Sequence, residues 1–529
     1  MRRAFIAMLL TMLFSLTMLS GCGGVNMPAA GTTQAEAGNE AKDSLVIGIG
    51  AEFSQVVPNS NNVAVANRDG AAIYALYDTL LWRNTETGEI EPWLATSWDV
   101  SDDGLEYTIK LREDVTFHNG APMTAADVAW TYNLLPDNPN VMSQQFPPFD
   151  HAEAVDEYTV KIYLSSPFVP FVNGMASYHM GILSKSYFDE VGGWEGYIAK
   201  PIGTGPYKFV SRTIGSNLKL EAYDGYWADK AKITNVTFNI LPDANSQIMS
   251  LENGEVDALL NVNVQNLLHL NEKTGAKWES CISDSCTQLG FNAGMSRIIE
   301  DDNLRKAIAS AINYDGLIQN VMGGYVEKAQ TFTHDGAGIT GRASDGTFTG
   351  TMEYDVEAAK KYLADSNYIP GTELSLICVS GSPEESIAKV IQGDLQSIGI
   401  NVQVNPIDGA SYFAKSYEPT GYDLSLNTYL PSLFDAYNLS QGQNRSARTY
   451  QTSLNPNKEK LADLADAANV EMDPKARQAI YAEMQSLINE NVYNNYMFYS
   501  ANTVAYREGL EGAKPIAGSN LRISQWYWK

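Results

Sequence analysis

The sequence predicts a mixed α/β protein made of several domain-sized units, with room for a cleft between lobes. The chain has 529 residues, which corresponds to about three to four units at ~150 residues each. Segments with strand-like alternation and segments with helix-like spacing follow one another along the chain. The hydrophobic share of 44% and the charged share of 19% are typical of a folded globular protein and exclude a disordered or collagen-like chain.

Three segments carry the clearest strand patterns. Residues 45–49 form a short apolar run that ends at Gly50, which predicts a buried strand at the start of a domain. Residues 106–112 and 218–222 alternate apolar and polar side chains. This period of two predicts strands that are buried on one face only.

Helices are predicted from caps and from apolar spacing. Residues 124–127 contain a capping box, with Thr124 and Asp127 three positions apart. Asp473 and Pro474 supply an N-cap followed by a proline at the first helical position. Residues 301–313 and 384–397 carry apolar side chains at helical spacing. We therefore expect helices that start after Thr124 and after Asp473, and two more in these spans.

The beginning of the chain has the pattern of an export signal. Arg2 and Arg3 precede an apolar stretch over residues 4–19. This stretch is shorter than the ~20 residues that a membrane span needs. No later segment is apolar over 18 residues, so the sequence predicts no membrane-spanning helix in the exported protein.

The apolar stretch ends in the sequence Leu-Ser-Gly-Cys at residues 19–22, which resembles the bacterial lipobox. The resemblance implies a lipoprotein signal peptide over residues 1–21 and a lipid on Cys22. Residues 22–43, rich in small and polar side chains after the cysteine, are then expected to form a flexible tether. We expect the protein to be anchored by this lipid alone on the outer side of the cytoplasmic membrane.

The charge and the cysteine and histidine content exclude several partners. A net charge of -26, from 36 basic and 62 acidic residues, would be repelled by nucleic acid. The five histidines are scattered, so no metal site and no cofactor are expected. Two arrangements of the cysteines stay open: a small-loop disulfide between Cys281 and Cys286, or free thiols, with Cys378 unpaired in either case.

One enzymatic alternative comes from two short motifs. Residues 216–219 and 273–275 resemble the SxxK and KTG elements of exported serine acyl-transferases. That chemistry needs the serine and the lysine one helical turn apart. Ser216 leads into a strand pattern, where positions three apart face opposite sides of the sheet. A second match, residues 386–389, is helical but follows the KTG element. An exported acyl-transferase is therefore kept only as a remote alternative.

Three groups of motifs together resemble a known family. They comprise residues 77–81, 92–98, 101–107 and 110–120, then 201–208, 226–227 and 254–257, and then 289–292, 304–308 and 313–315. In order and spacing they are similar to the extracellular solute-binding proteins of family 5, the oligopeptide, dipeptide and nickel type that serves ABC importers. The likeness extends over residues 45–529.

The resemblance implies a periplasmic-binding-protein-like clamshell of class II type, with two lobes and an extra subdomain. It places lobe I at residues 44–82, 200–292 and 505–529, the extra subdomain II at 83–199 and lobe III at 293–504. Such a protein binds its ligand between the lobes, closes by hinge motion and delivers the ligand to the permease subunits of an importer. It is expected to be a monomer and not an enzyme.

The resemblance also points to ligand-binding residues in lobe III. Peptide-binding relatives anchor the ligand α-amine on an acidic residue that follows a Tyr-Asp strand. Here that element runs from Asn427, with Tyr429 at an aromatic position, Ser432 at the position of the anchoring acid and Asp435 at a later acidic position. A neutral Ser432 lacks the counter-charge for a buried ammonium. Asp435 is the candidate that could replace it.

Further candidates lie in both lobes. Glu52 and Phe53 occupy the ligand-contact stretch of lobe I that the resemblance implies, and Glu52 could meet a positive group. Tyr499 could stack on the ligand or fill the core. Arg445 and Arg448 could hold a carboxylate or lie on the surface.

The sequence therefore favours a lipoprotein that captures short peptides or peptide-like solutes for an ABC importer. A receptor for a nickel chelate or another non-peptide solute on the same fold is the alternative, which the neutral Ser432 favours. A sensor or adhesin that binds the ligand without transport is a third hypothesis.

Overall fold

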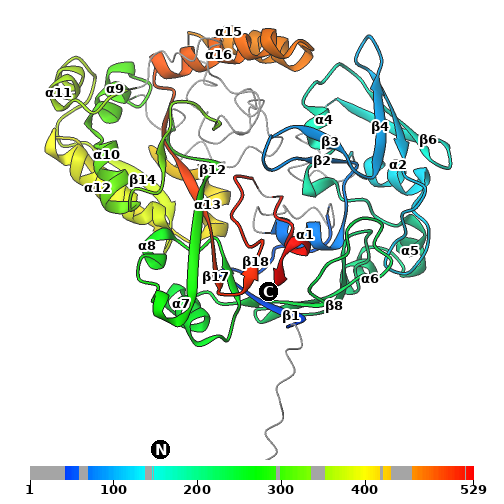
Figure 1. The fold of residues 1–529 in the computed structure, drawn as a ribbon. Coiled ribbons are helices and arrows are strands. Elements are labelled where there is room, and N and C mark those ends of the chain that lie inside the picture. Colours follow the sequence, from blue (N-terminus) through cyan, green and yellow to red (C-terminus); the bar gives the residue numbers. More distant parts are fainter. Residues whose placement is uncertain are drawn as a thin grey trace, which may run out of the picture. The chain divides into compact units, whose positions relative to one another are not determined.

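An eleven-stranded sheet runs through most of the chain in the computed structural model (Figure 1). The structure describes residues 42–58, 69–136, 146, 148–292, 298–334, 352–416, 421–429, 456–518 and 520–529. Helices and strands alternate through these ranges, which confirms the predicted mixed α/β class.

Ten strands of this sheet lie side by side, and β13 (Glu327–Lys328) pairs with one of them from outside the row. Their order is β15 (Asn401–Ile407), β14 (Glu373–Val379), β16 (Leu424–Tyr429), β12 (Ala276–Phe291), β17 (Asn494–Arg507), β11 (Ala258–Leu260), β1 (Ser44–Ile49), β10 (Asn235–Ile240), β9 (Asn217–Ala222) and β8 (Tyr207–Thr213). Strands β15, β14 and β16 are parallel, and so are β11, β1 and β10. The predicted strands at 45–49 and 218–222 are confirmed as β1 and β9.

The two long strands β12 and β17 lie antiparallel to each other and join the two parallel sets (Figure 1). Their register breaks twice, between Ile282 and Cys286 and again between Thr287 and Gln288, and the first break is the larger. Ile282 pairs with Ala501 and Cys286 pairs with Tyr499, so residues 283–285 of β12 lie opposite a single residue of β17. A bulge of this kind bends the strand and re-aims its side chains.

A separate antiparallel sheet comes from the region predicted as the extra subdomain. Its strands are β4 (Ala95–Val100), β5 (Glu106–Leu111), β7 (Thr159–Leu164) and β6 (Phe149–Asp156), next to the pair β2 (Leu81–Arg83) and β3 (Ile90–Pro92). Helices α2 (Ala125–Asn133), α4 (Phe171–Gly174), η2 (Tyr178–Met180), α5 (Lys185–Glu190) and α6 (Trp194–Ala199) complete it. The capping box holds the start of α2, because the backbone amide of Thr124 donates to the carboxylate of Asp127 at 3.1 Å.

The remaining helices and short strands are α1 (Gly70–Leu76), α7 (Ala244–Asn253), α8 (Val264–Leu267), η3 (Glu272–Thr274), α9 (Asp302–Ala311), α10 (Tyr314–Gly316), η4 (Leu317–Val321), α11 (Val356–Ala364), α12 (Pro383–Ser397), α13 (Gly409–Ser416), α15 (Lys458–Val470), α16 (Pro474–Glu490), η8 (Ile523–Gln525), β18 (Leu510–Glu511) and β19 (Tyr527–Trp528). The predicted helices at 301–313 and 384–397 are confirmed as α9 and α12. Asp473 caps α16 by accepting from the amide of Ala476 at 2.8 Å.

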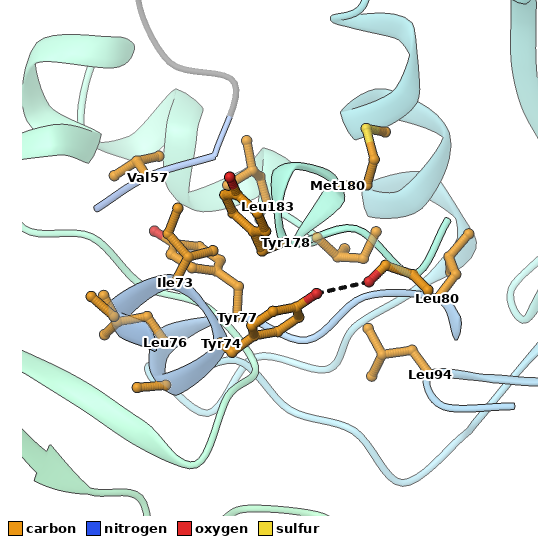
Figure 2. Close-up of a cluster of buried hydrophobic side chains, with 14 of the residues drawn as sticks. Val57, Ile73, Tyr74, Leu76, Tyr77, Leu80, Leu94, Tyr178, Met180 and Leu183 are labelled. Atoms are coloured by element: carbon orange, nitrogen blue, oxygen red, sulfur yellow. Dashed lines mark hydrogen bonds between the residues drawn. The ribbon is translucent and has the colours of Figure 1, made fainter. Parts of the chain in front are cut away.

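Buried apolar side chains form two main cores. The first combines residues from 45–260 with residues from 504–526, and the second lies within 289–498. Figure 2 shows part of the first core, where Tyr74 and Tyr77 pack near Tyr178. The domain boundaries given above stay a prediction.

A buried carboxylate ties the first core together. Asp78 accepts hydrogen bonds from the indole nitrogens of Trp93 (2.8 Å) and Trp227 (3.0 Å). The hydroxyls of Tyr226 and Thr204 donate to it as well, each at 3.1 Å. Burial raises the pKa of the Asp78 carboxyl, and the hydrogen bonds from the two tryptophans oppose this shift. These five residues all come from the motif segments described above. Their hydrogen bonds give these motif positions a role in holding the first core together.

The end of the chain closes this core. The Trp528 indole donates to the backbone oxygen of Ser44 at 3.0 Å, and Trp526 is buried. The Arg522 guanidinium stacks over Trp93, 4.3 Å from the ring centre. The first and last segments of the described chain therefore belong to one packed unit.

Candidate functional site

A cavity of about 250 Å³ lies where the parallel strands β11 and β1 meet the long strands β12 and β17. Its lining comes from the ends of β1 and β11, from α1, from the β12 bulge, from β17 and from the segment before η8. The lining residues are Ile49, Gly50, Ala51, Ala71, Leu260, Asn261, Ser285, Asn502, Thr503, Val504, Pro515, Ile516, Gly518 and Leu521. Ligand sites are typically concave, mostly apolar and supplied with a few polar groups, and this cavity fits that description.

The polar side chains of the cavity wall differ in whether they are hydrogen-bonded within the protein. Asn502 donates its amide to the backbone oxygens of Ile516 (2.8 Å) and Ala517 (3.1 Å). The Thr503 hydroxyl donates to the backbone oxygen of Val262 at 2.7 Å. These two side chains therefore hold the wall in place. Asn261, in contrast, is exposed and has a left-handed backbone with φ of 53°.

The bulge behind the cavity contains a buried ion pair. The Arg83 guanidinium lies 3.2 Å from one carboxylate oxygen of Asp284, and both side chains are almost fully buried. The other oxygen, Oδ1, is buried and has no hydrogen-bond partner. Burial raises the pKa of the Asp284 carboxyl, while the charges of Arg83 and His334 oppose the shift.

The same bulge is fastened to the segment before η8. The Asp284 amide and the Ser283 hydroxyl both donate to the backbone oxygen of Ala517, at 3.0 and 3.2 Å. Asn520 donates to the backbone oxygen of Arg83 at 2.7 Å. The bulge, β2 and the C-terminal segment thus form one hydrogen-bonded unit. Sequence reasoning missed Asp284, whose only signal was an acid among small and apolar residues between Cys281 and Cys286.

Glu52 and Phe53 lie directly after the cavity-lining Ala51 but turn into the protein. The Glu52 carboxylate pairs with Arg212 at 2.8 Å and accepts from the Gly215 amide at 2.5 Å. Burial would raise the pKa of Glu52, but the hydrogen bonds from Gly215 and Arg212 outweigh it and the pKa is lowered. Phe53 is buried against Phe238 in the first core. Their role in binding stays a prediction; in this structure Phe53 packs in the first core and Glu52 is held by Arg212 and the Gly215 amide.

Asn427 and Tyr429 lie on β16 and Tyr499 lies on β17, the two strands that flank β12. Cys286 of β12 is the register partner of both tyrosines. Tyr499 is buried and its hydroxyl bonds to Thr331. Tyr429 is half-buried, and the side-chain oxygen of Asn427 is buried without a hydrogen-bond partner. Asn427 is therefore the member of this group with an uncommitted polar atom.

Several predicted residues lie outside the described ranges. These are Cys22, Ser432, Asp435, Arg445 and Arg448. The predicted lipidation and the predicted replacement for the amine anchor stay predictions.

The disulfide between Cys281 and Cys286 is wrong, because both are free thiols. Both lie on the same strand, β12. Despite the bulge between them, Cys281 and Cys286 pair with Asn502 and Tyr499, which are three residues apart on β17. At ~3.3 Å per residue the two cysteines are about 10 Å apart, whereas the Cα atoms of a disulfide lie about 4.4–6.8 Å apart. Cys286 is instead buried in an apolar cluster, and burial raises the pKa of its thiol far above the usual range.

The acyl-transferase motif does not assemble. Ser216 lies in the turn before β9, and Lys219 lies on that strand opposite Thr237. Lys389 of the second match pairs with Glu385 at 2.7 Å. Within the described ranges no group of three or more potential metal ligands occurs, and no helix is long and apolar enough to cross a membrane.

Comparisons with known proteins agree on one family. The model of the bacterial extracellular solute-binding proteins, family 5 Middle, matches residues 89–451. The glutathione-binding protein GsiB of Pectobacterium atrosepticum is 28% identical over 482 residues, which cover 87% of this chain and 90% of that protein.

Two solved structures share the fold. The ABC transporter substrate-binding protein CtaP of Listeria monocytogenes has a TM-score of 0.79 and 26% identity, over 92% of this chain and all of that chain. The periplasmic binding protein AgaA of A. tumefaciens in complex with agropinic acid has a TM-score of 0.78 and 25% identity, over 92% of this chain and 99% of that chain.

Proposed function

The chain belongs to family 5 of the bacterial extracellular solute-binding proteins, and we propose that it captures a short peptide or peptide-like solute for an ABC importer. The observation that carries this proposal is the cavity at the ends of β1 and β11. Its wall includes both long strands that run between the two cores. The glutathione-binding relative, which is similar over 87% of this chain, supports a peptide-like ligand.

The predicted clamshell, two lobes and an extra subdomain, is the fold shared with the solved relatives. Strands β12 and β17 pair with each other along both halves of the sheet, and their register breaks at residues 283–285. A break in the ladder between two cores is a suitable hinge position. Ligand bound beside Ser285 would contact this hinge directly and shift the balance between open and closed states.

The family and the relatives are binding proteins rather than enzymes, and we expect no turnover of the ligand. We also propose that the protein is an exported monomer held by a lipid on Cys22. The variant Cys22→Ser should move the protein from the membrane fraction to the soluble fraction. Continued membrane association of this variant would contradict the lipid anchor.

A non-peptide solute is the second candidate. AgaA, at 25% identity, was solved with agropinic acid. In this chain, Ser432 stands at the position where peptide-binding relatives have an acid for the ligand amine. A neutral side chain there supports a ligand without a buried ammonium at that position.

Native mass spectrometry of residues 43–529, purified without refolding, tests the two candidates. This range falls within the compact unit of Lys42–Lys529. A ladder of peptide masses, absent after unfolding and refolding, would support the peptide function, and one discrete non-peptide mass would support the alternative. If the protein is empty, a thermal-shift screen follows, and a melting temperature that no peptide raises would contradict the peptide function.

A further inference from the structure

The cavity has a chemical character of its own. None of the fourteen described residues that line it carries a titratable side chain, and most of this described wall is aliphatic or backbone. We propose that the cavity binds an uncharged, predominantly apolar group of the ligand, with the Asn261 carboxamide as a hydrogen-bonding residue at its rim. This inference rests on the proposed function and names the class of solute that the site selects.

The volume of the cavity fits such a group. A dry apolar cavity of about 150 Å³ is large enough to hold benzene. At about 250 Å³, this cavity can accept the side chain of leucine or phenylalanine together with part of a peptide backbone. Burial of that apolar surface favours binding because it is removed from water.

Among the residues that the structure describes, the wall offers no counter-charge to a charged group. Glu52, next to the lining Ala51, is held by Arg212 and the Gly215 amide. Asp284, next to the lining Ser285, is paired with Arg83. An ion that enters a poorly hydrated site without a partner loses its hydration without compensation. The cavity therefore discriminates against lysine, arginine, aspartate and glutamate side chains.

Asn261 supplies the polar contact. Its amide donates to the backbone oxygen of Thr503 at 2.9 Å, which fixes the backbone in the left-handed conformation. Its carboxamide has no hydrogen-bond partner within the part of the chain that the structure describes. Glycine would adopt this conformation without strain. An exposed asparagine at the mouth of a cavity can both donate to and accept from a ligand amide.

Two substitutions test the apolar cavity and the Asn261 hydrogen bond separately. Ala51→Phe places a ring at the cavity wall from an exposed position. The matched control is Ala364→Phe at the exposed end of α11. Asn261→Gly removes the carboxamide but keeps the left-handed conformation, so it should leave the melting temperature unchanged or raise it.

The probes are four tripeptides, Ala-Leu-Ala, Ala-Phe-Ala, Ala-Lys-Ala and Ala-Asp-Ala, titrated calorimetrically into the full chain from which any retained ligand has been removed by unfolding and refolding. We expect the leucine and phenylalanine peptides to bind at least tenfold more tightly than the charged ones. Ala51→Phe should abolish this preference, and Ala364→Phe should keep it. Asn261→Gly should weaken binding of the two apolar peptides about fivefold. Equal affinities for all four peptides, or unchanged affinity in Asn261→Gly, would overturn the inference while leaving the peptide function intact.

A second probe does not depend on peptide binding. Benzyl alcohol should give a saturation-transfer NMR signal with the wild-type chain and with Ala364→Phe, and the signal should disappear in Ala51→Phe. If no tripeptide binds but benzyl alcohol gives this pattern of signals, the proposed peptide function is contradicted and the proposed apolar cavity is supported. Absence of the signal from the wild-type chain would overturn the inference.

Discussion

Two buried aspartates show how differently this fold treats the same side chain. Asp78 and Asp284 are 4% and 0% exposed, and burial raises the pKa of both. Asp78 accepts hydrogen bonds from two indoles and two hydroxyls. Asp284 meets Arg83 through one oxygen, and its other oxygen has no partner.

This difference indicates that Asp78 belongs to a rigid part of the protein and Asp284 to a part that moves. A fully satisfied network rigidifies a core and specifies its geometry. A half-satisfied carboxylate is costly, so its persistence calls for an explanation. Asp78 lies inside the first core, whereas Asp284 lies on the bulge beside the cavity, where the two long strands change register. We expect the Asp284 region to rearrange when the lobes move and the Asp78 region to stay fixed.

The largest effect is expected when Asp78, the carboxylate whose hydrogen bonds are all made, is removed. Asp78→Ala leaves two indoles and two hydroxyls without their buried acceptor. Each unsatisfied buried donor costs about 1–3 kcal/mol, so we expect a loss of about 4 kcal/mol or more in the free energy of unfolding. Chemical denaturation would measure it, with Asp229→Ala at an exposed position as the control. A loss below 1 kcal/mol would show that the network around Asp78 contributes little.

A double-mutant cycle tests the ion pair. Asp284→Leu alone leaves a buried guanidinium and should cost about 3 kcal/mol, because breaking a buried pair typically costs 3–5 kcal/mol. Arg83→Met alone should cost a similar amount. The double variant should recover most of this loss, since it buries neither charge. If the losses in the free energy of unfolding are additive, Arg83 and Asp284 contribute to stability independently of each other. The difference between Asp284 and Asp78 would then come from packing and not from the ion pair.

The pH dependence of stability sharpens the comparison. The pKa of Asp284 is raised above its ordinary value of 3.8, so its contribution to stability is complete below about pH 3.8 and is lost as the pH rises through the folded-state pKa. The variant Asp284→Asn lacks this titration. Its stability relative to the wild type should therefore increase from pH 4 to pH 7. Denaturation curves at several pH values check the sign, and a decrease would contradict the raised pKa.

The smallest effect is expected at Glu52, an acid that is only partly buried. Its pair with Arg212 is partly solvated, so Glu52→Gln should cost about 0.5 kcal/mol of stability. Because the pKa of Glu52 is lowered, this contribution is present above pH 4.5 and is lost as the pH falls. The same variant should leave solute affinity unchanged. A loss of affinity by calorimetry would restore Glu52 as a contact for a positive ligand group.

Local elements could be predicted from the sequence because their signals are local. The capping box at Thr124 and the proline after Asp473 specify where α2 and α16 begin. The alternation over residues 106–112 and 218–222 gives β5 and β9. The motif segments were enough to predict the family, although the role of Asp78 became visible only in the structure, where three other motif segments supply its hydrogen bonds.

The site could be predicted only in part because it depends on long-range pairing. That Glu52 meets the ligand stays a prediction, whereas its pairing with Arg212, 160 positions away, is invisible to a local pattern. The choice between a disulfide and free thiols stayed open in the sequence because the cysteine spacing does not reveal that Cys281 and Cys286 lie on one strand, β12, where both are free. Asp284 and Asn261 became candidates only through the bulge and the cavity, which arise where strands from both ends of the chain pair.

The contact between Trp528 and Ser44 joins positions 484 residues apart, and this sets an order of events in time. A chain that crosses a membrane with its N-terminus first delivers β1 long before β17 and η8. Contacts with such large sequence separation form slowly. The first core therefore stays incomplete until the final segment is available to pack against it.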